Sequence, residues 1–230
     1  MKSMEEKITK LATVFGLLLG CSKSYYKLFA SSTNNPAKMI SGDKVESEKF
    51  GKTTLFEITI YCLFRLDLSL VKLEQQDDVR EELFLFCVEN TVKKFEKELK
   101  NNNLREIIDN RLNGYGAIIR NSNKDKFQEF FFHLLQLIYK SQNSNKVDFR
   151  NFEGETVILA DAFQEFSLKA NLFEGERNIV SCFGCCLKHL FQDNDNFMLL
   201  TLQEIEERIN DGIREAKEIL KNDESQNSSN

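Results

Sequence analysis

The stretch TTLFEITIYCLFRLDLSLVKL, residues Thr53–Leu73, is the longest nearly apolar run of helical length in the chain. At 100° per residue, its apolar side chains cover most of the circumference of a helix. They are Leu55, Cys62, Leu63, Leu66, Leu70 and Leu73 on one stripe, and Phe56, Ile60, Phe64 and Val71 beside it. The remaining arc carries Glu57, Tyr61, Arg65, Ser69 and Lys72. A helix that is apolar on several sides needs cover on several sides, so this stretch predicts the central helix of a bundle.

Part of this stretch also fits a strand, because Arg65–Leu70 alternates between polar and apolar residues. The length of the whole run and the helical patterns on both sides of it favour a helix. Composition agrees with that choice. One proline and ten glycines in 230 residues are too few for a turn-rich all-β protein.

Helical periodicity recurs along most of the chain and predicts an all-α fold, an irregular bundle of six to eight helices around residues 53–73. We expect one helical domain over residues 1–221, with a candidate flexible break at 141–151 and a disordered tail at 222–230. A capping box, Thr201-x-x-Glu204, predicts the start of the last helix. The other expected helices cover the N-terminal stripe to Tyr26, Asp77 or Asp78 to Lys100, Leu104–Arg120, Phe127–Lys140 and Leu202–Lys221.

Two charged residues interrupt apolar stripes. Asp67 points into the apolar sector of the central helix, and Arg111 lies in the middle of the stripe of residues 104–120. A buried charge needs a partner, and these two have opposite sign. We therefore predict an ion pair between Asp67 and Arg111, with Tyr115 one turn after Arg111 and able to donate its hydroxyl to the carboxylate. The alternative interpretation is a polar pocket that binds an anionic ligand through Arg111.

The N-terminal segment has two interpretations. A short charged start, an apolar stretch and then Leu18-Leu19-Gly20-Cys21 resemble a bacterial lipoprotein signal. That resemblance implies lipidation of Cys21 and attachment to a membrane. An amphipathic first helix is the competing interpretation, because the helical stripe continues past Cys21 to Tyr25 and Tyr26.

The sequence contains one cluster of cysteine and histidine residues, Cys182-x-x-Cys185-Cys186-x-x-His189. On a helix these four side chains run along about 10.5 Å of axis, so one ion cannot reach all of them. We expect no structural metal there, and we interpret isolated cysteines as small buried hydrophobes of a reducing compartment.

Two residue pairs that include a carboxylate are weaker candidates for a metal or catalytic site. Glu129 and His133 have i,i+4 spacing, but the pattern puts them on a polar face with Gln136. Asp161 and Glu165 share one helix side, and nothing nearby supplies a second catalytic group. We expect both pairs to be solvated surface.

No catalytic, phosphate-binding or cofactor motif is recognisable in the sequence. A net charge of −5 with scattered basic residues gives no surface for nucleic acid. These observations favour a non-catalytic helical module of the cytoplasm that binds another protein or itself, without a cofactor. The alternatives are an envelope lipoprotein anchored through Cys21 and a small metal- or carboxylate-dependent enzyme.

Overall fold

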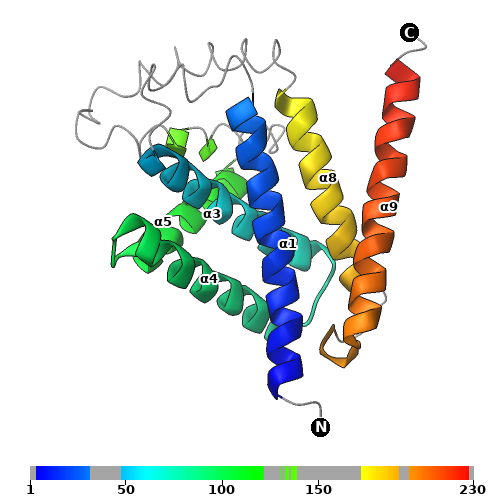
Figure 1. Ribbon diagram of the computed structural model, residues 1–230, viewed down its shortest axis with the longest axis horizontal. Coiled ribbons are helices and arrows are strands. Elements are labelled where there is room, and N and C mark those ends of the chain that lie inside the picture. The colour runs from blue at the N-terminus through cyan, green and yellow to red at the C-terminus, as the bar shows by residue number, and fades with distance from the viewer. Residues whose placement is uncertain are drawn as a thin grey trace. The chain divides into compact units, whose positions relative to one another are not determined.

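The computed structural model describes residues 4–31, 48–121, 130, 133–134, 136–138, 172–191 and 197–227. Within these residues the protein is all-α, a multi-helix bundle of seven helices without a strand (Figure 1). The helices are α1 (Met4–Ser31), α3 (Glu48–Lys72), α4 (Asp77–Leu99), α5 (Leu104–Asn121), α8 (Leu172–Phe191), the 3₁₀-helix η4 (Phe197–Leu199) and α9 (Leu202–Asn227).

Helix α3 confirms the prediction made from Thr53–Leu73. Every residue from Phe56 to Phe64 is buried, so the helix is covered around its circumference there. Its start at Glu48 precedes the predicted one. Glu74, just beyond its end, has φ of 52°, a left-handed conformation that terminates the helix.

Local signals account for several helix ends. The backbone N–H of Glu204 donates to Thr201 Oγ1 at 3.2 Å, and the N–H of Thr201 donates to Glu204 Oε2 at 2.6 Å. This reciprocal pair confirms the predicted capping box. Lys100 ends α4 with φ of 50°. Helix α9 continues past the predicted end at Lys221 to Asn227.

The described residues form two compact units, and α1, α3, α4 and α8 contribute to both. Unit 1 comprises the described parts of 1–21, 62–90 and 176–230, and unit 2 those of 22–61 and 91–175. The single domain expected from the sequence stays a prediction. Its candidate break at 141–151 lies outside the described residues, as do 228–230 of the expected tail.

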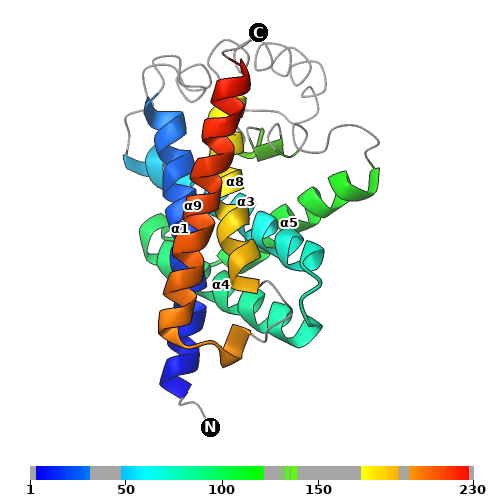
Figure 2. The same cartoon turned by 90° about the vertical axis from the view of Figure 1, so that its right-hand side faces the viewer.

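In unit 1, α8 and α9 lie side by side and run antiparallel (Figures 1 and 2). A Cβ atom at Gly212 of α9 would lie 2.6 Å from Cys186 Cα and 2.7 Å from Cys186 N on α8. Only a residue without a side chain allows this approach. The close contact buries Ile205 and Ala216 of α9.

The turn between α8 and α9 is held by a buried lysine. Lys10, with 1% of its side chain exposed, donates from Nζ to the carbonyl oxygen of Met198 at 2.9 Å. Its charge is balanced by Glu6, whose Oε1 lies 3.2 Å from Nζ. The rings of Phe191 and Phe197 pack against each other at the same turn, with centroids 5.1 Å apart and planes tilted by 44°. Residues far apart in the sequence thus fix the start of α9.

The Gly212 contact gives a stability prediction. Gly212→Ala is expected to lower the free energy of unfolding by about 1–3 kcal/mol, because the added methyl group forces α8 and α9 apart. The matched control is Gly16→Ala in α1, where nothing lies within 4 Å of the new Cβ. That variant should gain up to about 1 kcal/mol from helix propensity. Urea denaturation of the two variants measures both changes, and equal stabilisation by both would contradict the close packing.

Candidate functional site

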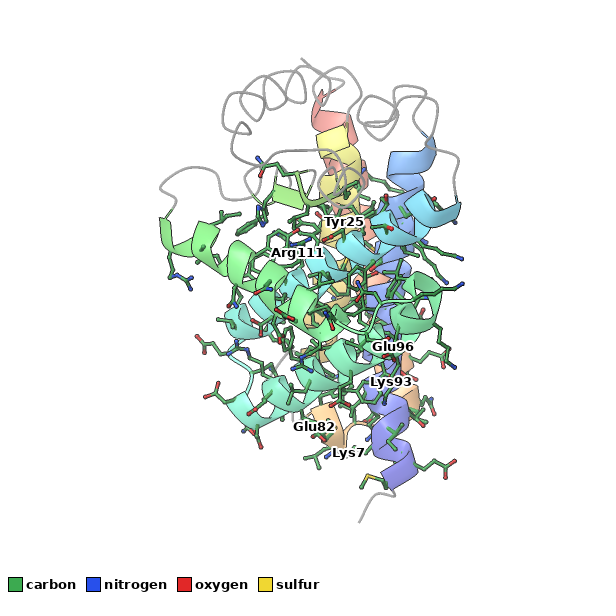
Figure 3. The ribbon with its side chains drawn as sticks, turned by 90° about the vertical axis from the view of Figure 1, so that its left-hand side faces the viewer. Lys7, Tyr25, Glu82, Lys93, Glu96 and Arg111 are labelled. Atoms are coloured by element: carbon green, nitrogen blue, oxygen red, sulfur yellow. The ribbon has the colours of Figure 1, made fainter. Side chains whose placement is uncertain are left out.

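Among the described residues of unit 2, an ion pair with a buried carboxylate joins α3 to α5. Arg111 donates from Nε to Glu57 Oε2 at 3.2 Å and from Nη2 to Glu57 Oε1 at 3.3 Å. Only 3% of the Glu57 side chain is exposed, against 27% for Arg111. Figure 3 shows Arg111 on α5, on the side that faces α3. Burial raises the pKa of the Glu57 carboxyl, and the positive charge of Arg111 opposes that shift.

The predicted pairing of Asp67 with Arg111 is therefore wrong. Asp67 belongs to unit 1, where Arg80 donates to it from Nε at 2.8 Å and from Nη2 at 3.2 Å. The short turn after α3 brings the first turns of α4 back beside Asp67, so a local partner is available. About a third of each side chain is exposed, 32% for Asp67 and 34% for Arg80. Asp67 is thus not the deeply buried anomaly that the helical pattern indicated.

Tyr115 also has a different environment from the predicted one. It is fully buried in unit 2, where its ring lies 5.6 Å from that of Tyr61 and 4.9 Å from that of His133. Tyr61 in turn meets Tyr25 edge-on at 5.7 Å. These rings form a polar aromatic core beside the Glu57–Arg111 pair. Both carboxylate oxygens of Glu57 accept from Arg111, and the binding of an anionic ligand through Arg111 stays a prediction.

The histidine expected on the surface packs inward. The Nε2 atom of His133 lies 2.9 Å from the place where a Cβ of Gly114 would stand, so the glycine makes room for the ring. His133 is therefore part of the contact with α5 and not solvated surface as predicted. Glu129, Asp161 and Glu165 lie outside the described residues.

Two cysteines of unit 1 contact each other from different helices. Cys21 Sγ of α1 lies 3.7 Å from Cys62 Sγ of α3. The contact with Cys62 and burial raise the pKa of the Cys21 thiol, and the charge of Cys182 on α8 adds to that rise. Cys21 lies in the interior of α1, which continues to Ser31. Its lipidation stays a prediction.

The rest of the cysteine–histidine segment contacts α9. His189 Nε2 lies 2.7 Å from Glu215 Oε2, and Lys188 Nζ lies 2.7 Å from Glu215 Oε1. These two neighbours lower the pKa of the Glu215 carboxyl, Lys188 more than His189. Among the residues that the structure describes, no three His, Cys, Asp or Glu side chains lie close enough together to hold a metal ion.

An open groove lies between α1 and the first half of α4, and all its residues belong to unit 1. Its volume is about 470 Å³. Three apolar side chains and four carboxylates line it: Leu11, Leu85 and Phe86, with Asp78, Glu81, Glu82 and Glu89. Lys7 Nζ lies 2.5 Å from Glu82 Oε1. Both residues are labelled in Figure 3. A groove lined by both carboxylates and apolar side chains can hold a chain that carries both positive charges and apolar groups.

Sequence reasoning missed the groove, although a signal for it was present. Glu81, Leu85 and Glu89 recur every four residues and are all exposed, which places one apolar side chain between two carboxylates on a helix face. It also missed Glu57 and the thiol contacts, because these depend on which helices meet.

No protein-family model matches the chain, and neither the curated proteins nor the solved structures include one that is significantly similar to it. None of the helices in the described part of the chain is both long and apolar enough to cross a bilayer. The geometry of the two units is therefore the basis on which a function can be proposed.

Proposed function

We propose that this chain is a non-catalytic helical interaction module whose groove between α1 and α4 binds a basic amphipathic helix of a partner protein. The observation that carries the proposal is the combination of three apolar side chains with four carboxylates in one open groove. Amphipathic helices commonly bind by laying an apolar face into such a groove.

The apolar surface of the groove extends along α1. Met4 and Ile8 lie on the same helical stripe as Leu11, at spacings of four and three residues. They are exposed by 73% and 49%, and Leu85 on α4 by 38%. Burial of this surface by a partner would contribute about 25 cal/mol for each Å² of apolar area removed from water.

Charge selects the kind of partner. Lys7 offsets the charge of Glu82 within the groove. Asp78, Glu81 and Glu89 line the same groove, and all three are exposed. Lysine or arginine side chains on either side of an apolar stripe would meet these carboxylates, whereas an acidic helix would be repelled. Binding should weaken as salt concentration rises, because exposed charges are screened.

The test uses the full chain and a fluorescein-labelled 16-residue peptide of Leu and Lys with amphipathic helical spacing. Fluorescence anisotropy should show saturable binding to the wild-type chain. The double variant Glu81→Lys/Glu89→Lys should bind at least about tenfold more weakly, a loss of about 1.4 kcal/mol.

The matched control is Glu206→Lys/Glu218→Lys on α9, which changes net charge by the same amount at two exposed positions away from the groove residues. It should bind the peptide within about twofold of the wild-type affinity, because only long-range, salt-screened electrostatics change. Equal weakening by the two double variants would mean that binding follows net charge and not the groove, and would contradict the proposal.

A further inference from the structure

Two cysteines that the proposed interaction does not use face each other from α1 and α3. Cys21 Sγ lies 3.7 Å from Cys62 Sγ, and both residues belong to unit 1. Each cysteine lies well inside a continuous helix, Met4–Ser31 for α1 and Glu48–Lys72 for α3. The distance between the two sulfurs is therefore set by how the two helices pack.

Cys21 is part of the buried stripe of α1. It follows Leu18 by three residues and precedes Tyr25 by four, so the three side chains share one face of the helix. Leu18 and Tyr25 are fully buried. The ring of Tyr25 meets that of Tyr61 edge-on, with centroids 5.7 Å apart, and Tyr61 directly precedes Cys62 on α3. The sulfur contact thus belongs to the packed core and is not a loose surface contact.

The distance between these sulfurs suits the formation of a disulfide. A disulfide bond is about 2.05 Å long, so the sulfurs must approach by about 1.7 Å, which modest rotations about the two Cα–Cβ bonds can supply. Cys62 is buried and Cys21 half-buried, so Cys21 is the thiol of the two that a small molecule can reach. Cys186 on α8 makes a different contact, because its thiol lies 3.8 Å from the carbonyl oxygen of Ile209.

We propose that Cys21 and Cys62 form a reversible disulfide that joins α1 to α3 when the thiol–disulfide balance around the protein becomes oxidising. A small disulfide such as oxidised glutathione is the oxidant. The Cys21 sulfur attacks one sulfur of the oxidant, whose S–S bond breaks, and one glutathione leaves. Cys62 then attacks the Cys21 sulfur of the mixed disulfide and expels the second glutathione. The two protein thiols lose two electrons and two protons, which the two released glutathione thiols carry.

The disulfide would close a loop that consists of residues 22–61. These residues belong to unit 2, whereas the two cysteines belong to unit 1. A crosslink across a loop of this length restricts the unfolded chain, so oxidation should stabilise the fold. The contact with Cys62 and burial raise the pKa of the Cys21 thiol. Because the thiolate is the attacking form, the exchange should be slow, and the test lets it reach equilibrium.

The test equilibrates the reduced full chain in mixtures of reduced and oxidised glutathione. Free thiols are then blocked with N-ethylmaleimide in urea, and the chain is digested without reductant. Trypsin puts Cys21 in the peptide 11–23 and Cys62 in 53–65, apart from the other four cysteines. Mass spectrometry should find 11–23 linked to 53–65 in the oxidising mixtures. The link should disappear again when reduced glutathione is added in excess.

Thermal unfolding shows whether the fold holds the two thiols in place. The oxidised chain should unfold at a temperature at least about 5 °C above that of the reduced chain, because the crosslink restricts the unfolded state without straining the folded one. A lower unfolding temperature for the oxidised chain would mean that α1 and α3 must separate to form the bond, and it would overturn the proposal.

Two variants identify the pair. Cys21→Ala removes the partner that a small molecule can reach, and it should lose both the link and the difference in unfolding temperature. Cys182→Ala is the matched control, because Cys182 is half-buried like Cys21. It keeps the pair and should form the link at the same glutathione ratio as the wild type. Absence of the link in the wild type, a link from 11–23 to another peptide in its place, or loss of the link in Cys182→Ala would overturn the proposal.

Discussion

An Arg111→Met variant is expected to lose about 3–5 kcal/mol of unfolding free energy at pH 7, the usual cost of leaving one charge of a buried pair without its partner. Glu57 has 3% of its side chain exposed, and both its oxygens accept from Arg111. Methionine preserves much of the volume of the arginine stem, so the loss reports the charge more than the packing. Urea denaturation followed by circular dichroism measures the change.

The loss of unfolding free energy in Arg111→Met should become smaller as pH falls from 8 to 5. Burial raises the pKa of Glu57, and removal of Arg111 removes the charge that opposes this shift. The folded variant then binds a proton more tightly than the unfolded chain does, so lower pH stabilises it relative to the wild type. Glu57→Gln is the matched control. It removes the buried negative charge and leaves Arg111 half-buried, where water can reach it. Glu57→Gln should therefore lower the free energy of unfolding by less than Arg111→Met does. A pH-independent loss, or a larger loss for Glu57→Gln, would contradict this account of the pair.

Removal of Leu202–Asn230 is expected to abolish the cooperative unfolding transition of the chain. Helix α9 covers α8 through the close approach at Gly212, and it buries Ile205 and Ala216. Without it, the buried side chains of Cys185 and Cys186 on α8, which lie against Gly212 and Ile209, and apolar side chains near them lose cover. Each such exposure costs about 1.5–3 kcal/mol, and a few of them equal the total stability of a typical domain, about 5–15 kcal/mol.

Removal of 222–230 alone is the control, because this segment contains no apolar residue. That shorter truncation should unfold at nearly the wild-type temperature. Thermal unfolding by circular dichroism, with molar mass from light scattering, distinguishes the alternatives. A fully folded chain lacking Leu202–Asn230, with a lower molar mass in solution, would show instead that α9 joins two copies of the chain.

The helices could largely be predicted from sequence because their signals are local. The apolar run at Thr53–Leu73 identified the buried α3, and the Thr201–Glu204 box marked the start of α9. The start of α3 at Glu48 was missed, because residues 48–52 carry little apolar periodicity.

The polar contacts could not be predicted in the same way. Periodicity placed Glu57 and Tyr61 on the polar arc of α3, yet both are buried, since a helix covered on all sides buries its polar side chains as well. Arg111 was recognised as an anomaly, but its partner depends on how α5 lies against α3. Lys10 was missed for a similar reason, because its acceptor is the backbone of Met198 and no side-chain pattern predicts it.

A charge-swap experiment tests the proposed interaction most directly. The variant with Lys at positions 78, 81 and 89 replaces the three exposed carboxylates that line the groove beside the Lys7–Glu82 pair. Charge complementarity predicts that this variant loses the Leu/Lys peptide and gains a Leu/Glu peptide of the same spacing, with the reverse preference in the wild type. If the two proteins prefer the same peptide, the groove does not select its partner by charge and the proposed function is contradicted.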